Sequence, residues 1–363
     1  MRARGSCHEA RRASNCARNR ADEPRAFTNR VQGLGVIDAE RRLAGIAFLG
    51  TLVPNRMNRF LLTGSLFLAS LMTTPRLAAA ESRLLAPGAR VEKLGGGYEF
   101  TEGPAANARG DIFFTDQPND RIVRWDAQSG TFSDWLKPCG RANGTYFDAR
   151  GHLLTCSDEL NQLWSISPDK TVTVLVKDFG GRLLNGPNDL WVRPDGALYF
   201  TDPRYPRPYW KRDPKTQQAG EHVYFLDAKR ASAPKPVATD LKQPNGIIGT
   251  PDGKTLYVAD IGAGKTYAYD VQPGGELAGK RLFCNLGSDG MTLDAEGNVY
   301  LTGKGVTVFD KAGQQIEHLD IPEGWTANVT FGGTNNDLLF ITASKSIYGA
   351  RLRVKGAGRV VQK

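Results

Sequence analysis

One pattern returns six times along the chain, and this repetition limits the possible folds more than any other feature of the sequence. Each copy opens with a side chain that carries an oxygen, continues through a short apolar stretch and a turn, and ends in an apolar strand. The opening residues are Glu102, Asn143, Asn188, Asn245, Asp289 and Asn328. They are separated by 41, 45, 57, 44 and 39 residues. Periods of this length are typical of folds built from repeated supersecondary units.

The residues between the copies predict further strands. Most copies are followed by an apolar run with an aromatic residue near its end, as at residues 122–126, 223–227 and 306–310, and a looser fourth strand usually follows. Asp-Gly and Pro-Asp-Gly turns separate these runs, and helical periodicity is nearly absent. Four strands per period indicate a blade, so six copies predict an all-β fold, a six-bladed β-propeller.

Closure of the ring can also be predicted. A strand expected at residues 89–93 would complete the last blade and remove the exposed edge of an open array. The alternative fold is a β-sandwich with accidental internal similarity, which does not account for six copies in register.

Nearly all of the net charge of +9 lies in the N-terminal part of the chain. Residues 1–80 contain 13 arginines and 5 acidic residues, whereas residues 81–363 contain 34 basic and 33 acidic residues. A nearly neutral body gives no electrostatic reason to expect a nucleic acid or a membrane surface as a partner.

Residues 57–80 have the pattern of a secretory signal peptide. Met57 and Arg59 form a short basic start, residues 60–72 are an apolar run, and three alanines precede Glu81. The run is too short to cross a bilayer. We therefore expect residues 81–363 to be an exported propeller domain, periplasmic or secreted. Residues 1–56 are expected to be an upstream extension, either disordered or not part of the mature protein, and a basic arm with its own role is the alternative.

Three cysteines remain in the body, and this odd number excludes a disulfide framework. A single bridge between Cys139 and Cys156 and a set of buried free thiols both remain open from the sequence.

The six opening residues are expected to face the central channel, because the first strand of each propeller blade lines it. Asn-Gly and Asp-Gly pairs also suit tight turns, but that explanation does not cover Glu102 or Asn188. Carboxylate and amide oxygens that converge without His or Cys suit a hard cation. We expect one divalent cation, with Ca²⁺ as the first choice and Mg²⁺, Mn²⁺ or Zn²⁺ as alternatives. Asn143, which opens the second copy and is also expected to face the axis, is expected to bind substrate.

The interval between Asn188 and Asn245 is about a dozen residues longer than its neighbours and contains a run rich in proline, arginine and aromatic residues at 203–212. Such an insertion could form a lid over the mouth of the channel. Its aromatic residues could stack on a ring of the substrate, and its arginines could donate hydrogen bonds to hydroxyl or carboxylate oxygens of the substrate. Arg204 and Tyr205, nearest the strand end, are the predicted substrate-binding residues. The alternative is a solvated, proline-stiffened loop.

With these copies laid out, the sequence resembles the senescence marker protein / gluconolactonase family, the group that includes regucalcin. The similarity extends over about residues 84–354. The matching segments are FTEGP at 100–104, LNGPNDL at 184–190, YFTDP at 199–203, QPNG at 243–246, SDGM at 288–291 and NVTFGG at 328–333.

The resemblance implies a propeller with one divalent ion on its axis, held by Glu102, Asn188, Asn245 and Asp289. It further implies that Asp289 is the catalytic acid/base and that Asn188 meets both ion and substrate. Two departures bear on the substrate: Gly186 stands where animal members have an arginine, and residues 157–159 contain no histidine where gluconolactonase-like members often have one.

The function implied is that of a metal-dependent hydrolase of carboxylic esters that opens a sugar lactone, as gluconolactonases do. As a hypothesis, the lactone carbonyl is polarised by the ion, while Asp289 takes a proton from the attacking water and passes it to the ring oxygen. Two alternatives remain: a non-catalytic secreted propeller with a structural calcium ion, and an arylesterase-like hydrolase. The expected partner is a small sugar lactone, with no nucleic acid and no membrane after signal removal, and the protein is expected to be a monomer or weak oligomer.

Overall fold

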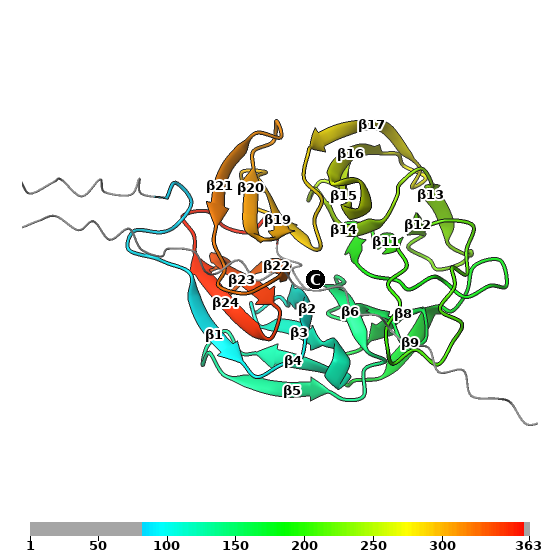
Figure 1. The fold of residues 1–363 in the computed structure, drawn as a ribbon, viewed down its shortest axis with the longest axis horizontal. Coiled ribbons are helices and arrows are strands. Elements are labelled where there is room, and N and C mark those ends of the chain that lie inside the picture. Colours follow the sequence, from blue (N-terminus) through cyan, green and yellow to red (C-terminus); the bar gives the residue numbers. More distant parts are fainter. Residues whose placement is uncertain (1–81, 359–363) are drawn as a thin grey trace, which may run out of the picture. The chain divides into compact units, whose positions relative to one another are not determined.

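Six antiparallel sheets of four strands each surround a central axis in residues 82–358, which are the residues that the computed structural model describes (Figure 1). The six-bladed β-propeller predicted from the repeat is therefore confirmed. The predicted signal peptide at residues 57–80 and the upstream extension at residues 1–56 lie outside the described residues.

The strands take the same order in every blade, from the axis outward. The innermost strands are β2 (Thr101–Ala106), β6 (Ala142–Phe147), β10 (Leu190–Val192), β14 (Pro244–Gly249), β18 (Met291–Leu293) and β22 (Thr326–Gly332). The second strands are β3 (Ile112–Asp116), β7 (Leu153–Ser157), β11 (Leu198–Asp202), β15 (Thr255–Asp260), β19 (Val299–Gly303) and β23 (Leu338–Ala343). The third strands are β4 (Arg121–Trp125), β8 (Gln162–Ile166), β12 (His222–Leu226), β16 (Lys265–Val271), β20 (Gly305–Phe309) and β24 (Ser346–Arg351). The outermost strands are β5 (Phe132–Leu136), β9 (Val172–Val176), β13 (Lys235–Ala238), β17 (Leu277–Cys284), β21 (Gln315–Leu319) and β1 (Glu92–Gly96).

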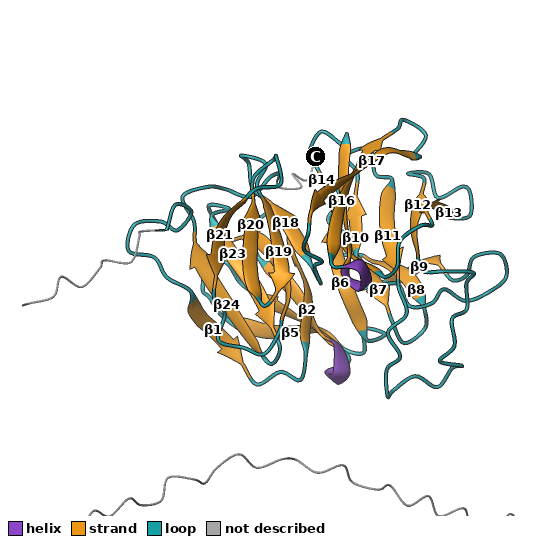
Figure 2. Ribbon diagram, turned by 45° about the horizontal axis from the view of Figure 1, so that its top comes forward, coloured by secondary structure: helices purple, strands orange, loops and turns teal. Residues whose placement is uncertain are grey.

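Helix is confined, in residues 82–358, to two single turns of 3-10 helix at Gln117–Asn119 and Ile261–Ala263 (Figure 2). The described part of the chain therefore contains no helix that is long and apolar enough to cross a membrane. Loops at both ends of the ring join the strands (Figure 2).

The ring closes where β1 pairs with β24, so the last blade takes its outermost strand from the N-terminal side of the domain (Figure 1). The strand predicted at residues 89–93 is observed at Glu92–Gly96, with Glu92 opposite Gly349. It begins three residues later than predicted, and an isolated bridge between Leu85 and Leu352 lies ahead of it. Closure gives β24 a partner on both sides and completes the fourth strand of the last blade.

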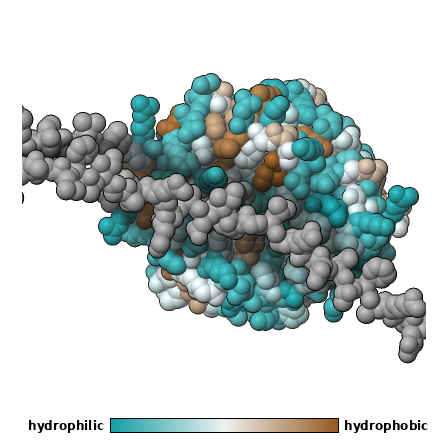
Figure 3. All heavy atoms as spheres, in the orientation of Figure 1, coloured by the Kyte–Doolittle hydropathy of each residue, from teal (hydrophilic) through white to brown (hydrophobic). Residues whose placement is uncertain are grey.

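The hydrophobic core is divided into clusters that fill the spaces between neighbouring blades. Strands β3, β7 and β11 are buried at every residue because they are covered by a blade on each side. Phe114 in the first blade and Phe340 in the last pack with ring centroids 5.8 Å apart, so the core continues across the closure. The visible surface of the described residues is mostly hydrophilic, with scattered hydrophobic side chains (Figure 3).

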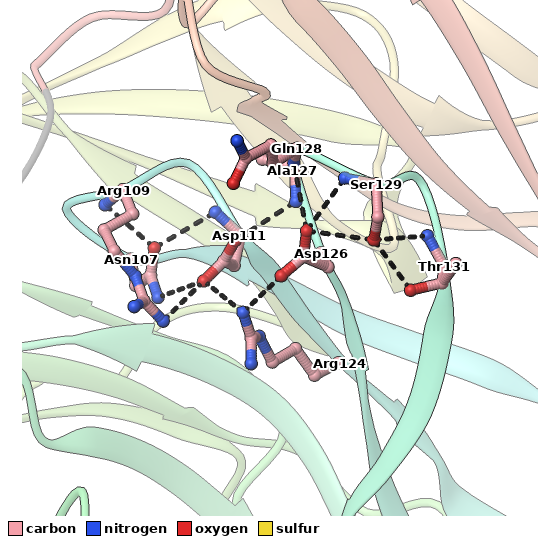
Figure 4. Close-up of polar contacts among 9 residues, drawn as sticks. All are labelled: Asn107, Arg109, Asp111, Arg124, Asp126, Ala127, Gln128, Ser129 and Thr131. Carbon is pink, nitrogen blue, oxygen red and sulfur yellow. Dashed lines mark hydrogen bonds and ion pairs between the residues drawn. The ribbon is translucent and has the colours of Figure 1, made fainter.

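In three copies an Asn or Asp stands three residues before the glycine of the turn that joins the first two strands of the blade. The turn between β2 and β3 shows why. Asn107 Oδ1 accepts hydrogen bonds from the backbone N–H groups of Arg109 (2.9 Å) and Asp111 (3.0 Å), which fixes the turn. The Asp111 carboxylate then accepts from Arg124 (3.0 Å) and from the Ala127 N–H (3.1 Å), which ties this turn to the end of β4 (Figure 4). The equivalent turn acceptors in two other blades are Asp148 and Asp294.

Cys139, Cys156 and Cys284 are buried free thiols. Of the two alternatives that the sequence left open, the bridge between Cys139 and Cys156 is therefore not observed. Burial raises the pKa of the Cys139 thiol to about 12, so this thiol is inert at neutral pH.

Candidate active site

The opening residues of the six copies form a ring around the axis. Each lies at the start of an inner strand or one or two residues before it, and neighbouring inner strands contact one another around the whole circle. The buried members are Glu102, Asn143, Asn188, Asn245 and Asn328, and Asp289 is partly buried. The repeat therefore brings six side-chain oxygens from distant parts of the sequence to one level of the channel.

The glycine after most opening residues allows the blades to approach one another closely. A Cβ atom on Gly103 would lie 2.0 Å from the carbonyl oxygen of Asn143, and one on Gly144 would lie 2.5 Å from that of Asn188. The N–H of Gly144 donates to the same Asn188 oxygen at 2.7 Å. A Cβ on Gly246 would likewise lie 2.7 Å from the carbonyl oxygen of Asp289, and one on Gly290 would lie 2.0 Å from the side-chain amide carbon of Asn328. These glycines are thus explained by contact between blades, whereas tight-turn geometry was the alternative considered from the sequence.

Aspartates at the ends of second strands hold the backbone that leads to the opening residues. Asp202 accepts hydrogen bonds from the N–H groups of Asn185 (3.0 Å) and Gly186 (2.9 Å), just before Asn188. The equivalent bonds before Glu102 and Asn245 are made by Asp116 and Asp260. Each of these aspartates fixes where the inner strand of its own blade begins, and so positions an opening side chain.

Asp289 is held by two hydrogen-bond donors. Asn245 Nδ2 donates to Asp289 Oδ1 at 2.8 Å, and the indole Nε1 of Trp325 donates to Asp289 Oδ2 at 2.6 Å. The same amide nitrogen of Asn245 also donates to the Tyr205 hydroxyl at 2.9 Å. These contacts join the fourth and fifth blades to the predicted lid.

Glu102 faces the same space from the first blade. Its Oε2 accepts from the N–H of Gly103 at 2.8 Å and from Asn328 Nδ2 at 3.3 Å. Burial raises the pKa of Glu102 well above its usual range, and the nearby charge of Asp289 raises it further. Burial also raises the pKa of Asp289, against the opposing effect of its two donors, and raises that of Asp189 to about 7. The carboxylates therefore repel one another in a poorly solvated space.

The available oxygens fit a hard divalent cation. The Oδ1 atoms of Asn143 and Asn245 are buried without a hydrogen-bond partner, and the Asn188 side chain makes no hydrogen bond within residues 82–358. Those residues contain no group of three or more His, Cys, Asp or Glu side chains arranged for a metal, so a cation would depend on two carboxylates and amide oxygens. Oxygen-only sets suit Ca²⁺, and a divalent charge would offset the repulsion between Glu102 and Asp289.

Segment 203–221, which joins β11 to β12, is docked onto the body of the domain. The Tyr209 hydroxyl and the Trp210 indole both donate to Asp158 Oδ2, at 2.5 and 3.1 Å. Trp210 and Arg212 also lie 3.4 Å from a Cβ built on Gly186, so they occupy the space beside the position where the resemblance leads one to expect an arginine.

The two predicted substrate-binding residues of this segment differ in their placement. Tyr205 reaches the ring through its bond with Asn245, and Asn143 belongs to the ring itself. Arg204 donates instead to the carbonyl oxygen of Pro214 at 2.6 Å, within its own loop. Among residues 82–358, no side-chain hydrogen bond or ion pair joins Arg204 to the opening residues.

Trp325 and Asp158 were missed by reasoning from the sequence. Trp325 lies three residues before Asn328, and the available signal was a lone tryptophan close to an opening residue. Asp158 lies within residues 157–159, which were noted only for lacking a histidine. The hydrogen bonds of both side chains join segments that are far apart in the chain, so no local pattern predicts them.

A cavity of 440 Å³ occupies the axis at the far ends of the inner strands. Its lining is largely apolar, and Asp189 and Asn328 border it from the level of the ring. Among the apolar lining residues are Tyr146, Trp191, Ile247, Met291 and Phe331. The ring therefore lies between segment 203–221 on one side and this apolar cavity on the other.

Comparison with known proteins gives consistent matches. Residues 100–345 match the model of the family described as the SMP-30/Gluconolactonase/LRE-like region. A gluconolactonase from Zymomonas mobilis is 24% identical over 313 residues, which cover 78% of this chain and 86% of that protein. A solved gluconolactonase from Xanthomonas campestris is 31% identical, with a TM-score of 0.68 over 73% of this chain and 90% of that one. A solved putative gluconolactonase is 29% identical, with a TM-score of 0.71 over 76% of this chain and 96% of that one.

Proposed function

Because this chain belongs to the SMP-30/gluconolactonase/LRE-like family, we propose that it is a metal-dependent hydrolase that opens a sugar lactone. It is a lactone-hydrolysing enzyme, and so a carboxylic ester hydrolase, like its relatives that are named gluconolactonase. The observation that most directly supports the finer proposal is the position of Asn245, which donates to both Asp289 and Tyr205. A predicted cation ligand, the predicted acid/base and a lid residue thus meet at one point.

Asp289 has the contacts that a base needs. Each of its oxygens accepts one hydrogen bond, from Asn245 or from Trp325, which leaves a free lone pair on each. When bound, a divalent cation supplies positive charge that polarises the lactone carbonyl and stabilises the negative charge that develops on its oxygen. Asp289 removes a proton from the attacking water and returns it to the ring oxygen as the ester C–O bond breaks. Asn143, Asn188 and Tyr205 orient the sugar.

The test is a pH-stat assay of the purified chain with aldonolactones and aryl esters, before and after chelation. The proposal predicts acid release from lactones that chelation abolishes and added cation restores. Hydrolysis of aryl esters in preference to lactones would favour the arylesterase-like alternative. A bound cation with no hydrolysis of either class would favour the non-catalytic propeller.

The cation proposed is Ca²⁺, because the ligands are carboxylate and amide oxygens. The predicted ligands are Glu102, Asn188, Asn245 and Asp289. Adding back Ca²⁺, Mg²⁺, Mn²⁺ or Zn²⁺ singly to the chelated protein identifies the ion, and recovery with Zn²⁺ alone would contradict this choice. Gel filtration at several concentrations tests the further proposal that the protein is a monomer or weak oligomer.

Export to the periplasm or the medium is also proposed, on the pattern of residues 57–80 alone. N-terminal sequencing of the mature protein should find Glu81 as the first residue. A protein that retains residues 57–80 in the cytoplasm would contradict the proposal.

A further inference from the structure

Segment 203–221 brings an excess of positive charge to the ring. It contains five basic and two acidic residues, on a body whose basic and acidic residues nearly balance. Its Tyr205 hydroxyl is 2.9 Å from the amide nitrogen of Asn245, and that nitrogen is 2.8 Å from Asp289. Tyr205 therefore places one part of this basic segment beside the proposed reaction site, where a local charge can select among substrates.

The arginines of this segment differ in how their guanidinium groups are used. Arg204 donates to the carbonyl oxygen of Pro214 at 2.6 Å, and Arg212 donates to that of Asn185 at 2.6 Å. Arg212 also stacks on Trp210, 3.4 Å from the ring centroid. Each of these two side chains thus has one acceptor within the protein that holds the segment in place, although Nε and Nη1 of Arg212 are buried without an acceptor.

Arg207 has no such partner. Its side chain makes no hydrogen bond to any residue in 82–358, its Nε is buried without an acceptor, and only 25% of its side chain is exposed. Asp158 is the nearest carboxylate, but the distance from Arg207 Nε to Asp158 Oδ2 is 3.8 Å, which is too long for a hydrogen bond. Asp158 Oδ2 already accepts from Tyr209 and Trp210.

Arg207 lies on the side of the segment that faces the ring. Its guanidinium carbon is 5.5 Å from the centroid of the Tyr205 ring, whose hydroxyl reaches Asn245. Its charge acts on Asp289 and lowers the pKa of that carboxyl against the effect of burial. Apart from its long ion pair with Asp158, the buried Nε–H of Arg207 has no acceptor, and such a buried donor is costly unless an acceptor from outside the protein completes its hydrogen bonding.

The chemistry of that acceptor follows from the geometry of arginine. The guanidinium is a planar fork of N–H donors that matches a carboxylate with two parallel hydrogen bonds, and such charge-assisted pairs are stronger than bonds to neutral hydroxyls. We infer that the preferred substrate is a sugar lactone that carries a free carboxylate, and that Arg207 binds that carboxylate. This inference rests on the proposed lactone hydrolysis and names its substrate class. Water adds to the lactone carbonyl, the ring C–O bond breaks, and the product is an open-chain dicarboxylate with release of one proton.

The experiment compares two substrates that differ only in this group: glucono-1,4-lactone, which ends in a hydroxymethyl group, and glucaro-1,4-lactone, which ends in a carboxylate. The purified chain with its cation should have at least a tenfold higher kcat/KM for the acid lactone. Arg207→Gln should lower the ratio of the two kcat/KM values at least tenfold, mainly by raising KM for the acid lactone. Arg207→Lys, which keeps the charge but not the fork, should give an intermediate ratio.

Lys211→Gln is the matched control, because it removes one positive charge from an exposed position on the same segment. Its ratio should equal that of the unmodified protein, which separates direct contact from general electrostatic attraction. Thermal unfolding of each variant verifies that the fold is retained.

The possible failures can be told apart. If the protein opens neither of the two test lactones and no other lactone, the proposed function fails. If lactones are opened but the acid lactone is not preferred, or if Arg207→Gln lowers both kcat/KM values equally, the inference is wrong and Arg207 acts on the segment or on the reacting carbonyl instead. An unchanged ratio in Arg207→Gln overturns it as well.

Discussion

At the scale of single residues, the account depends on how the atoms around Asp289 are arranged. Trp325 and Asn245 each donate to one oxygen of this carboxylate, so its orientation is fixed before substrate binds. Glu102 and Asp189 add nearby negative charge, while burial disfavours ionisation of all three groups. The cation that we propose for this site would therefore stabilise both the protein and the reaction.

Replacing Asp289 by Asn should lower kcat by about three orders of magnitude, because the amide cannot accept the proton from water. The melting temperature should change little, since both hydrogen-bond partners can rearrange around an amide. Steady-state kinetics with a fixed, saturating cation concentration measures the effect. Glu102→Gln serves as the comparison, and is expected to weaken cation binding more than it lowers kcat at saturation. Unchanged turnover in Asp289→Asn would remove this residue from the mechanism.

Replacing Trp325 by Phe tests the role of the indole N–H and predicts a pH effect. The Trp325 bond lowers the pKa of Asp289, so its loss should raise that pKa. Because the ionised carboxylate is the active form, the acidic limb of the profile of kcat/KM against pH should move to higher pH. At neutral pH we expect a loss of about tenfold, equivalent to roughly 1.4 kcal/mol. An acidic limb that stays in place or moves to lower pH would show that Trp325 does not act on Asp289.

At the scale of strands and turns, two devices position the opening side chains. Aspartates at the ends of β3, β11 and β15 bind the backbone ahead of the inner strand of the same blade. Glycines after the opening residues let adjacent inner strands touch, which a Cβ would prevent. Both devices act on the backbone. They therefore determine the position from which an opening side chain projects, without taking part in the chemistry.

Gly144→Ala should destabilise the fold by about 1–3 kcal/mol, because its Cβ would lie 2.5 Å from an oxygen of Asn188 and from one of Asp189, inside a close-packed ring. Denaturant unfolding measures this change. Gly324→Ala is the control, since a Cβ there meets no atom within 4 Å, and its stability should change by less than about 0.5 kcal/mol. Equal stability of the two variants would refute the role assigned to inter-blade contact.

Asp260→Asn should loosen the backbone at residues 242–243 and so displace Asn245. We expect weaker cation binding, by about tenfold, with a smaller effect on kcat once the cation is saturating. Calorimetric titration of the chelated variant with Ca²⁺ provides the measurement. If affinity is unchanged, the aspartate serves the strand end alone and does not position the site.

At the scale of the whole molecule, the repeat determines the architecture and the ring determines the site. Removing residues 82–97 would leave the third strand of the last blade, β24, unpaired along one edge. We expect that variant to melt at least 10 °C lower or to aggregate, because an exposed edge pairs with other chains. Differential scanning calorimetry and light scattering report the two outcomes, and an unaltered melting curve would contradict the role of closure.

Much of this could be predicted because the information is local and repeated. Six copies of one strand pattern predict six blades, and the position of Glu102 or Asn245 within its copy predicts that it faces the axis. The contacts of Trp325 with Asp289, and of Tyr209 with Asp158, could not be predicted, because they join residues 36 and 51 positions apart through loops of irregular shape. Arg204 illustrates the same limit, since its sequence position indicates a site residue but its bond runs to Pro214.

The central claim is that Glu102, Asn188, Asn245 and Asp289 hold one hard cation on the axis. A crystal structure of the protein grown with Ca²⁺, with an anomalous difference map, tests it most directly. The account predicts a single anomalous peak on the axis, at about 2.3–2.6 Å from oxygens of these four side chains. A map with no peak among these four residues, or with its calcium at another place, would contradict the account.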